Sequence, residues 1–228
     1  MHLGFTQLGP LANRQKLLAI SPHLDDVALG CADLVAAHPS AVVVTVVAGR
    51  PGPHELTDWD RQCGFGPDDD VMGARREEDA AAVRVLGASP VWLEFLDRQY
   101  AHDWASPRPD EVASALRPLA GEASLVASPL GMLHPDHVAV GQACYAVARA
   151  IPDVRWVVYE DAIYRATDGA SGEATARLIS AGFTLKELAI PPAERKREAI
   201  ACYTSQVKGL GGLLEDAYRP ERYWELGR

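Results

Sequence analysis

Several features that define other classes of protein are missing from this chain of 228 residues. No apolar run approaches the roughly 20 residues that a membrane-spanning helix requires, and the first residues lack the apolar centre of a signal peptide. No run of five or more basic residues occurs, and the net charge is −9. An acidic chain binds nucleic acid and anionic lipid poorly. We therefore expect a cytoplasmic protein that binds neither nucleic acid nor a membrane.

Cysteine is scarce and scattered. The four cysteines (Cys31, Cys63, Cys144 and Cys202) form no CxxC pair, so their spacing indicates neither a disulfide framework nor a thiolate zinc site. Reduced thiols are typical of a cytosolic protein. With 48% hydrophobic and 23% charged residues, the composition is that of an ordinary globular domain.

Apolar segments alternate with helical patterns along the chain. The predicted strands are 17–21, 41–48, 91–96, 124–128, 155–159 and 183–190. The predicted helices are 26–37, 73–86, 110–120, 137–150, 172–181 and 193–206. Such alternation is typical of an α/β fold. We expect one domain over residues 1–228, Rossmann-like and doubly wound, with a mainly parallel sheet and helices on both faces.

The segment 49–72 interrupts this alternation. It is rich in Gly, Pro and Asp and far longer than an ordinary connection between a strand and a helix, as functional or mobile loops often are. A disordered surface insertion is one interpretation. Trp59 and Phe65 favour packing over an active site or against a partner subunit, so a homo-oligomer is an alternative that the sequence leaves open.

Histidine and aspartate gather after two of the predicted strands. His23, Asp25 and Asp26 follow the first strand, and a His-Pro-Asp-His run at 134–137 follows the fourth. Ligands of α/β sheets bind beyond the carboxyl ends of the strands. Each cluster alone also fits a helix start, where Asp is favoured as a cap, but two such clusters at one sheet edge favour a functional site.

His23, Asp26 and His137 together supply two imidazoles and one carboxylate. Three protein ligands with an open fourth position are typical of catalytic zinc, although the same donors also suit Fe²⁺ or another divalent ion. Water bound to such an ion becomes a nucleophile near neutral pH. The three residues therefore predict a metal-dependent hydrolase.

The other polar residues of the two clusters have roles in the same chemistry. Asp25 is left to accept the proton of the attacking water, and His134 is left to stabilise the oxyanion that forms on an attacked carbonyl. Asp136 lies between the histidines and is placed to orient an imidazole. This set predicts hydrolysis of an amide or an ester.

The motifs resemble those of the PIG-L/LmbE-like family of zinc-dependent N-deacetylases. The family signature His-x-Asp-Asp stands here within SPHLDD, and His-Pro-Asp-His is intact. A third motif is similar to the stretch from Arg75 to Gly87, and a fourth to the stretch from Lys196 to Gln206. The segment YEDAIYR at 159–165 also looks like the end of the fifth strand of the family.

The resemblance implies an LmbE-like fold and a role for each matching residue. His23, Asp26 and His137 match the zinc ligands, Asp25 the general base and His134 the electrophilic histidine. Arg75 and Asp97 resemble positions that contact the substrate.

Two departures concern the substrate. Many members have Pro at the position of Leu24 and Glu at that of Val27. Leu24 is a form associated with members that act on natural-product or antibiotic intermediates.

The leading hypothesis is removal of an N-acetyl or other N-acyl group from a small amino sugar, a glycoconjugate or a natural-product intermediate. A wider amidase that cleaves a thiol conjugate or a peptide-like metabolite is an alternative. A nucleotide-binding protein is disfavoured, because the first strand is followed by PHLDD and not by GxGxxG. A non-catalytic protein that kept this fold is the last alternative.

Overall fold

The first two predicted strands lie next to each other in the sheet. β2 (Leu17–Ser21) pairs in parallel with β3 (Val42–Thr45) on one side and with β5 (Leu125–Pro129) on the other. The structure is a computed structural model that describes residues 6–7, 16–53 and 56–228. Residues 54 and 55 of the segment 49–72 therefore lie outside the described residues.

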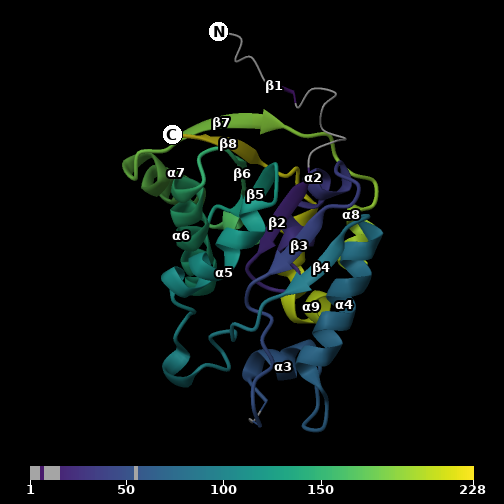
Figure 1. The fold of residues 1–228 in the computed structure, drawn as a ribbon. Helices are drawn as coiled ribbons and strands as arrows, with labels where there is room; N and C mark the ends of the chain where they lie inside the picture. Colours follow the sequence, from purple (N-terminus) through teal and green to yellow (C-terminus); the bar gives the residue numbers. More distant parts are fainter. Residues whose placement is uncertain (1–5, 8–15, 54–55) are drawn as a thin grey trace.

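The strands form one sheet in the order β1-β7-β8-β6-β5-β2-β3-β4 (Figure 1). The remaining strands are β1 (Thr6–Gln7), β4 (Ser89–Trp92), β6 (Arg155–Tyr159), β7 (Thr184–Ala189) and β8 (Tyr223–Gly227). β8 runs antiparallel to both β6 and β7, whereas the other pairs of described strands are parallel. The predicted α/β class with a mainly parallel sheet is confirmed. β8 was not predicted, because no helix precedes it as in a parallel crossover.

Helices cover both faces of the sheet. They are α1 (Asp26–Gly30), α2 (Ala32–Ala36), α3 (Asp58–Cys63), α4 (Val71–Val85), α5 (Pro109–Gly121), α6 (Pro135–Ala150), α7 (Ala170–Ser180), α8 (Lys196–Ala201) and α9 (Thr204–Leu210). The 3₁₀ turns are η2 (His102–Trp104), η3 (Tyr164–Ala166) and η4 (Gly211–Tyr218). Among the described residues, no helix has both the length and the apolar character needed to cross a membrane.

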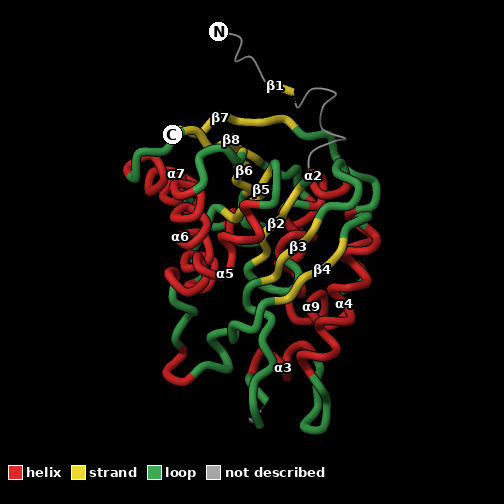
Figure 2. The backbone as a smooth tube through the Cα atoms, viewed as in Figure 1, coloured by secondary structure: helices red, strands yellow, loops and turns green. Residues whose placement is uncertain are grey.

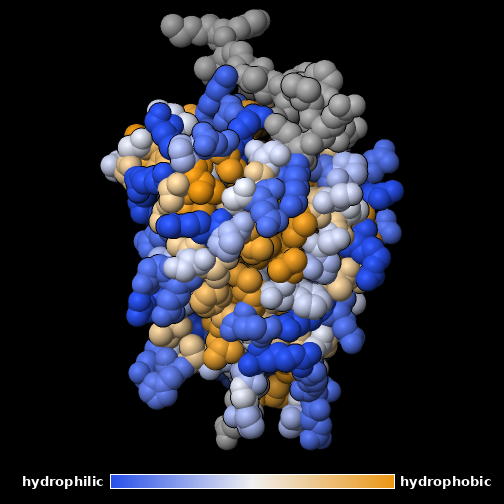
Figure 3. Space-filling model, in the orientation of Figure 1, coloured by the Kyte–Doolittle hydropathy of each residue, from blue (hydrophilic) through white to orange (hydrophobic). Residues whose placement is uncertain are grey.

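The alternation of side chains along β2 produces two separate hydrophobic cores. Leu18 and Ile20 belong to a core formed with α5, α6 and α7, whereas Leu17 and Ala19 belong to a core formed with α1, α2, α4 and α8. A strand that is apolar on both faces is typical of a parallel sheet covered by helices on each side. Figure 2 shows the helices on the two sides of the strands, with loops dominating the lower end where α3 lies. In Figure 3, hydrophobic residues form a band across the middle of the visible face, and hydrophilic residues flank it.

Two predicted helices are each divided into two shorter ones. The helix predicted at 26–37 is interrupted at Cys31, where the backbone leaves the helical region (φ −139°). The backbone amides of Ala32 and Asp33 then donate to the Glu221 carboxylate at 3.0 and 2.9 Å. Because Glu221 is distant in sequence, no local signal at 26–37 reveals that a second helix start is capped there.

The helix predicted at 193–206 divides in the same way into α8 and α9. At the start of α9, the Ser205 backbone amide donates to Glu78 at 2.8 Å, and the Ser205 hydroxyl donates to the same carboxylate at 2.6 Å. Glu78 lies on α4, so this helix start is also capped from a distant part of the chain.

The segment 49–72 contains a helix that packs on the domain. α3 begins with a capping box, in which the Thr57 side chain accepts from the Asp60 amide and the Asp60 side chain accepts from the Thr57 amide. A Cβ atom at Gly209 of α9 would lie 2.7 Å from Cys63 Sγ and 3.1 Å from the Trp59 ring. Only glycine lets the two helices approach this closely. A disordered insertion does not describe the part of this segment that contains α3.

A buried ion pair fixes α3 to α4. Arg75 donates to Asp60 Oδ1 at 3.0 Å, and the Tyr100 hydroxyl donates to the same oxygen at 2.7 Å. The side chains of Asp60 and Arg75 are 0% and 5% exposed, so neither charge has water as an alternative partner.

We expect Asp60→Asn to destabilise the protein by about 3–5 kcal/mol, because it leaves the Arg75 cation buried without a counter-charge. Urea unfolding followed by circular dichroism measures this change. Asp58→Asn is the matched control on the same helix, since Asp58 is fully exposed and pairs with the exposed Arg61; it should change stability by less than about 1 kcal/mol. Equal effects of the two substitutions would contradict a structural role for the buried pair.

Candidate active site

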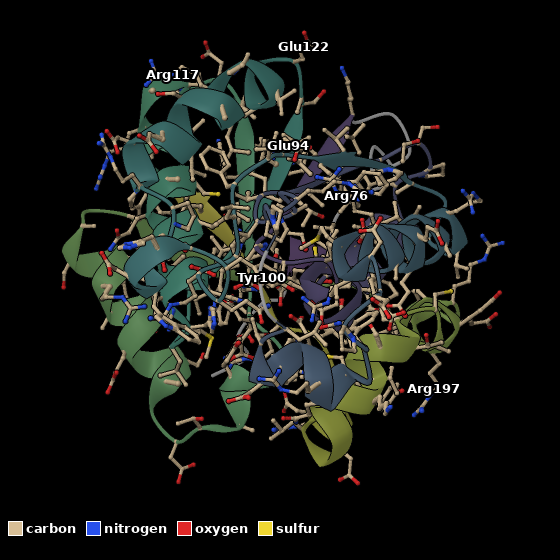
Figure 4. All side chains as sticks on the ribbon, turned by 90° about the horizontal axis from the view of Figure 1, so that it is seen from below. Arg76, Glu94, Tyr100, Arg117, Glu122 and Arg197 are labelled. Carbon is tan, nitrogen blue, oxygen red and sulfur yellow. The ribbon has the colours of Figure 1, made fainter. Side chains whose placement is uncertain are left out.

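The site lies where the sheet reverses its strand order. From β2, the chain adds β3 and β4 on one side, whereas β5 and β6 lie on the other side. A crevice forms beyond the carboxyl ends of the two strands that flank such a switch point. His23, Asp25 and Asp26 follow β2, and the run 134–137 follows β5. The topology therefore brings the two predicted clusters together. Figure 4 views the molecule from this end, with Tyr100 near the centre.

The turn after β5 has a special backbone. Gly131 has a left-handed φ of 74°, and its amide donates to Asp161 Oδ2 at 2.9 Å. Pro135 then opens α6 as its first residue, a position where the missing N–H costs nothing. His134 caps this helix, because its Nδ1 accepts from the Asp136 amide at 3.3 Å. The cap orients the His134 ring and leaves Nε2 free to carry its proton.

The three predicted metal ligands converge on one point. His23 Nδ1 lies 3.2 Å from His137 Nε2, and Asp26 Oδ2 lies 3.4 and 3.2 Å from these two nitrogens. A tetrahedral ion with ligand distances of about 2.0–2.2 Å places neighbouring donor atoms about 3.3–3.5 Å apart. The spacing of the three donors therefore fits a divalent metal.

Two further carboxylates hold the histidines in the tautomers that metal binding requires. His23 Nε2 lies 3.2 Å from Asp136 Oδ2, and His137 Nδ1 lies 2.5 Å from Asp161 Oδ1. Each of these nitrogens faces a carboxylate that can only accept, so in the neutral ring the proton lies on this nitrogen and the other nitrogen carries a lone pair. The two lone pairs face each other beside the Asp26 carboxylate. Carboxylate partners of this kind also raise the basicity of a ligating imidazole.

The pKa values show how strongly the site attracts positive charge. Burial lowers the pKa of His137, but Asp26 and Asp161 outweigh it and raise this pKa to about 9. The pKa of His23 is also raised well above its ordinary value, because the hydrogen bonds to Asp136 and Asp26 outweigh burial. Burial disfavours ionised Asp26, yet the facing imidazoles hold its pKa well below the usual range.

Asp25 and His134 line the same cavity, which has a volume of about 400 Å³. Burial and the neighbouring Asp26 carboxylate raise the pKa of Asp25 to about 7. Burial and the two other histidines lower the pKa of His134 to about 4, so this ring is neutral at pH 7. A carboxylate that titrates near neutrality and a neutral imidazole thus lie beside the three donor atoms.

The two residues expected to contact substrate both line the cavity, but they have protein partners. Arg75 is paired with Asp60, as described above. Asp97 accepts from the Gln99 amide at 3.0 Å and from the Gln99 side chain at 2.8 Å, and its Oδ2 lies 3.9 Å from His23 Nε2. Gln99 in turn accepts from the Thr57 hydroxyl at 2.7 Å, so the segment after Asp97 is attached to the start of α3.

Asp161 and Tyr164 were not among the predicted site residues. Asp161 is the second residue after β6, a position that the sequence marks by the pair Glu160-Asp161. Tyr164 packs its ring at 4.9 Å from the His137 ring, centroid to centroid. Its place in η3 could not be predicted, because Ile163 before it has an unusual positive φ of 63°, which a β-branched residue rarely adopts.

The two other motifs of the sequence hold helices together beside the site. Tyr203 donates to Asp79 at 2.8 Å, and Glu78 caps α9 through Ser205, so the motif on α4 binds the motif on α8 and α9. Gln206 extends this contact to α3, because it accepts from Trp59 Nε1 at 3.3 Å. Arg75 of the first motif and Gln206 of the second line the cavity.

This fold and this arrangement of donors define an α/β protein with a buried group of histidines and aspartates that could hold a metal ion. The family model for PIG-L, described as GlcNAc-PI de-N-acetylase, matches residues 18–148. The chain therefore belongs to the PIG-L family, which confirms the resemblance of its motifs.

Solved structures of deacetylases are similar to this protein over almost the whole chain. A deacetylase triple mutant of the teicoplanin biosynthetic pathway is 28% identical, with a TM-score of 0.75 over 93% of this chain and 98% of that one. The A40926 pseudoaglycone deacetylase Dbv21 is 25% identical, with a TM-score of 0.72 over 95% and 98%. The N,N'-diacetylchitobiose deacetylase from Pyrococcus horikoshii, at 18% identity and a TM-score of 0.53 over 89% and 74%, shares the fold. The comparison with curated proteins gave no match.

We expect zinc binding to release about one to two protons per ion at pH 7. The raised pKa values mean that His23 and His137 are protonated at this pH without metal, and both must lose a proton to ligate. The release should shrink, and the affinity should rise, as the pH passes the value of about 9 that His137 has in the free protein. Calorimetric titrations in buffers of different ionisation enthalpy measure the protons released. A release of zero at pH 7 would contradict the assignment.

We also expect Asp161→Asn to weaken zinc binding by about 10- to 100-fold, because the partner that orients His137 loses its charge. Competition with a fluorescent chelator measures the affinity. Asp33→Asn is the control, since Asp33 is a buried aspartate that accepts from the Ala193 amide away from the cavity. An equal loss in both variants would indicate a general effect on folding.

Proposed function

We propose that this protein is a divalent-metal-dependent N-deacetylase that acts on an amino sugar within a glycoconjugate or natural-product intermediate. The observation that carries the proposal is the convergence of two lone pairs and one carboxylate, each oriented by the fold, beside a carboxylate and a neutral imidazole in one cavity. The similarity to deacetylases of the teicoplanin and A40926 pathways supports this reaction and this class of substrate.

His23, Asp26 and His137 would hold the metal, with zinc as the first choice and Fe²⁺ as an alternative for the same donors. A bound divalent cation would polarise the acyl carbonyl and lower the pKa of a water molecule. Asp136 and Asp161 fix the ring orientations, so that the donor atoms are in place before the metal arrives.

Asp25 acts as the general base. Its pKa of about 7 lies near neutral pH, where about half of the Asp25 carboxyl groups are ionised, and a general base is most effective when its pKa lies near the operating pH. It accepts a proton from the attacking water and then holds this proton near the nitrogen of the scissile amide. Transfer of the proton to that nitrogen lets the amine leave, and acetate remains as the other product.

His134 acts as an electrophile without changing its charge. Its Nδ1 accepts a backbone hydrogen bond from Asp136, so the proton is on Nε2 and can be donated. Its low pKa keeps the ring neutral, and a neutral donor is not repelled by a nearby metal cation. A donor positioned before the reaction stabilises the developing oxyanion without reorganisation.

We expect Asp25→Asn to retain the metal but to lose about 10²- to 10⁴-fold in turnover, because an amide cannot accept the proton of the attacking water. Metal content is measured by mass spectrometry, and turnover by acetate release from a glycoside of N-acetylglucosamine. Asp26→Asn is the comparison variant and should lose metal and activity together. If Asp25→Asn loses the metal and Asp26→Asn keeps it, the roles of the two carboxylates are reversed. Faster acetate release from a simple N-acetylated alkylamine than from the glycoside would favour a wider amidase.

A further inference from the structure

Two exposed apolar side chains lie at the mouth of the cavity. Trp104 and Leu213 line it and are 61% and 60% exposed, although both are large hydrophobic residues. Leu133, which is 48% exposed, directly precedes His134. Some of the exposed hydrophobic residues of the described chain therefore lie at this opening. Exposed apolar patches often mark binding sites.

Trp104 is held in a fixed position relative to the metal ligands. Its carbonyl oxygen accepts from Arg98 Nε at 3.2 Å, and the Arg98 amide donates to Asp136 Oδ2 at 3.3 Å. The same Asp136 Oδ2 atom lies beside His23 Nε2. Asp103 and Trp104 have left-handed φ values of 59° and 56°, which residues other than glycine adopt at some energetic cost. The hydrogen bond from Arg98 to the Trp104 carbonyl stabilises this backbone conformation despite that cost.

Leu213 comes from a different part of the chain. It lies in η4, directly after α9, and its neighbour Leu210 is 8% exposed. Leu210 belongs to a core cluster against which Trp59 of α3 packs. The wall beneath Leu213 is therefore a packed part of the domain, whereas the Leu213 side chain itself projects into solvent.

The difference in exposure indicates which part of a substrate meets these two residues. The donor atoms are buried, with the His137 side chain 1% and the Asp26 side chain 12% exposed, so the amide must reach the inner end of the cavity. The apolar lining near that end, Leu24 and Leu29, is 5% and 3% exposed, and it can enclose a short acyl group. Residues at the mouth meet whatever part of the substrate extends out of the cavity. In a glycoside whose aglycone is larger than the sugar, the aglycone reaches that far, although it is attached next to the carbon that carries the amide.

We propose that Trp104 and Leu213 determine specificity by binding an apolar aglycone attached to the amino sugar. This proposal rests on the proposed function and narrows its substrate to amphiphilic glycoconjugates. Sugar hydroxyls lose hydrogen bonds to water when they are buried against apolar side chains, whereas an aromatic or aliphatic aglycone gains free energy in proportion to the apolar area that it buries there.

The test compares the 2-naphthyl and methyl β-glycosides of N-acetylglucosamine with the zinc-loaded enzyme. We expect the wild type to prefer the naphthyl glycoside in kcat/KM. Trp104→Ala and Leu213→Ala should each reduce the ratio of the two kcat/KM values by about five- to twentyfold, mainly through KM, because the contact is the same in ground and transition states. Trp104→Phe should retain part of the preference. Ile179→Ala is the matched control: Ile179 is 59% exposed on α7 and does not line the cavity.

Four results would overturn the proposal. The first is the absence of a naphthyl preference in the wild type, and the second is an equal loss on both glycosides in the variants. The third is a preference for longer N-acyl chains on the methyl glycoside that Trp104→Ala abolishes, which would assign the mouth to the acyl group. The fourth is a change of oligomeric state in Trp104→Ala with an unchanged preference, which would assign the mouth to a second copy of the chain.

A binding measurement separates this proposal from the proposed function. Calorimetric titration of both glycosides into zinc-loaded Asp25→Asn protein, with and without Trp104→Ala, needs no turnover. Tighter binding of the naphthyl glycoside that is lost in Trp104→Ala would support the aglycone site. If the wild type hydrolysed neither glycoside, that separate result would contradict the proposed deacetylation but not the aglycone site. Equal affinities for the two glycosides would contradict the aglycone site.

Discussion

The mutual repulsion of three electron-pair donors is the constraint on which the arrangement of the site depends. His23, Asp26 and His137 place lone pairs within 3.4 Å of one another, and such a group is stable in a buried position only with a cation or with added protons among its atoms. The raised pKa values of the two histidines are the response of the free protein to this repulsion. The fold supplies what holds the donors together, namely the adjacency of β2 and β5 and the two carboxylates behind the rings.

Carboxylates distant in sequence perform the same structural task elsewhere in the molecule. Glu221 caps α2, Glu78 caps α9, and Asp60 joins α3 to α4 through Arg75. In each case an acidic side chain satisfies backbone amides or a guanidinium that local sequence leaves without a partner. Some of the acidic residues that give the chain its negative charge therefore also stabilise its helix starts and helix contacts.

The sequence predicted well those features that depend on local periodicity or on strand ends. The apolar runs of β2 and β5 and the polar residues after them were sufficient to place both clusters at one edge of the sheet. The breaks at Cys31 and between α8 and α9 could not be predicted, because the groups that cap the new helix starts are far away in the chain. Arg75 illustrates the same limit at the site, since its pairing with Asp60 depends on how α3 folds back within the segment 49–72.

Chemistry and specificity are therefore supported by different parts of the structure. The residues of the chemistry lie on the turns after β2 and β5; they are the donor residues together with Asp25 and His134. A small displacement of these turns would change the distances that catalysis requires. The walls of the cavity come from α3, the segment 97–104 and the turn after α9, which are joined to one another by Gln99, Thr57 and Gln206. The segment 97–104 contacts Asp136 through the Arg98 backbone amide and not through a side chain, so side chains farther out in the walls can differ without disturbing the donors. A change of substrate within this fold thus requires changes in the walls, and the metal site can remain the same.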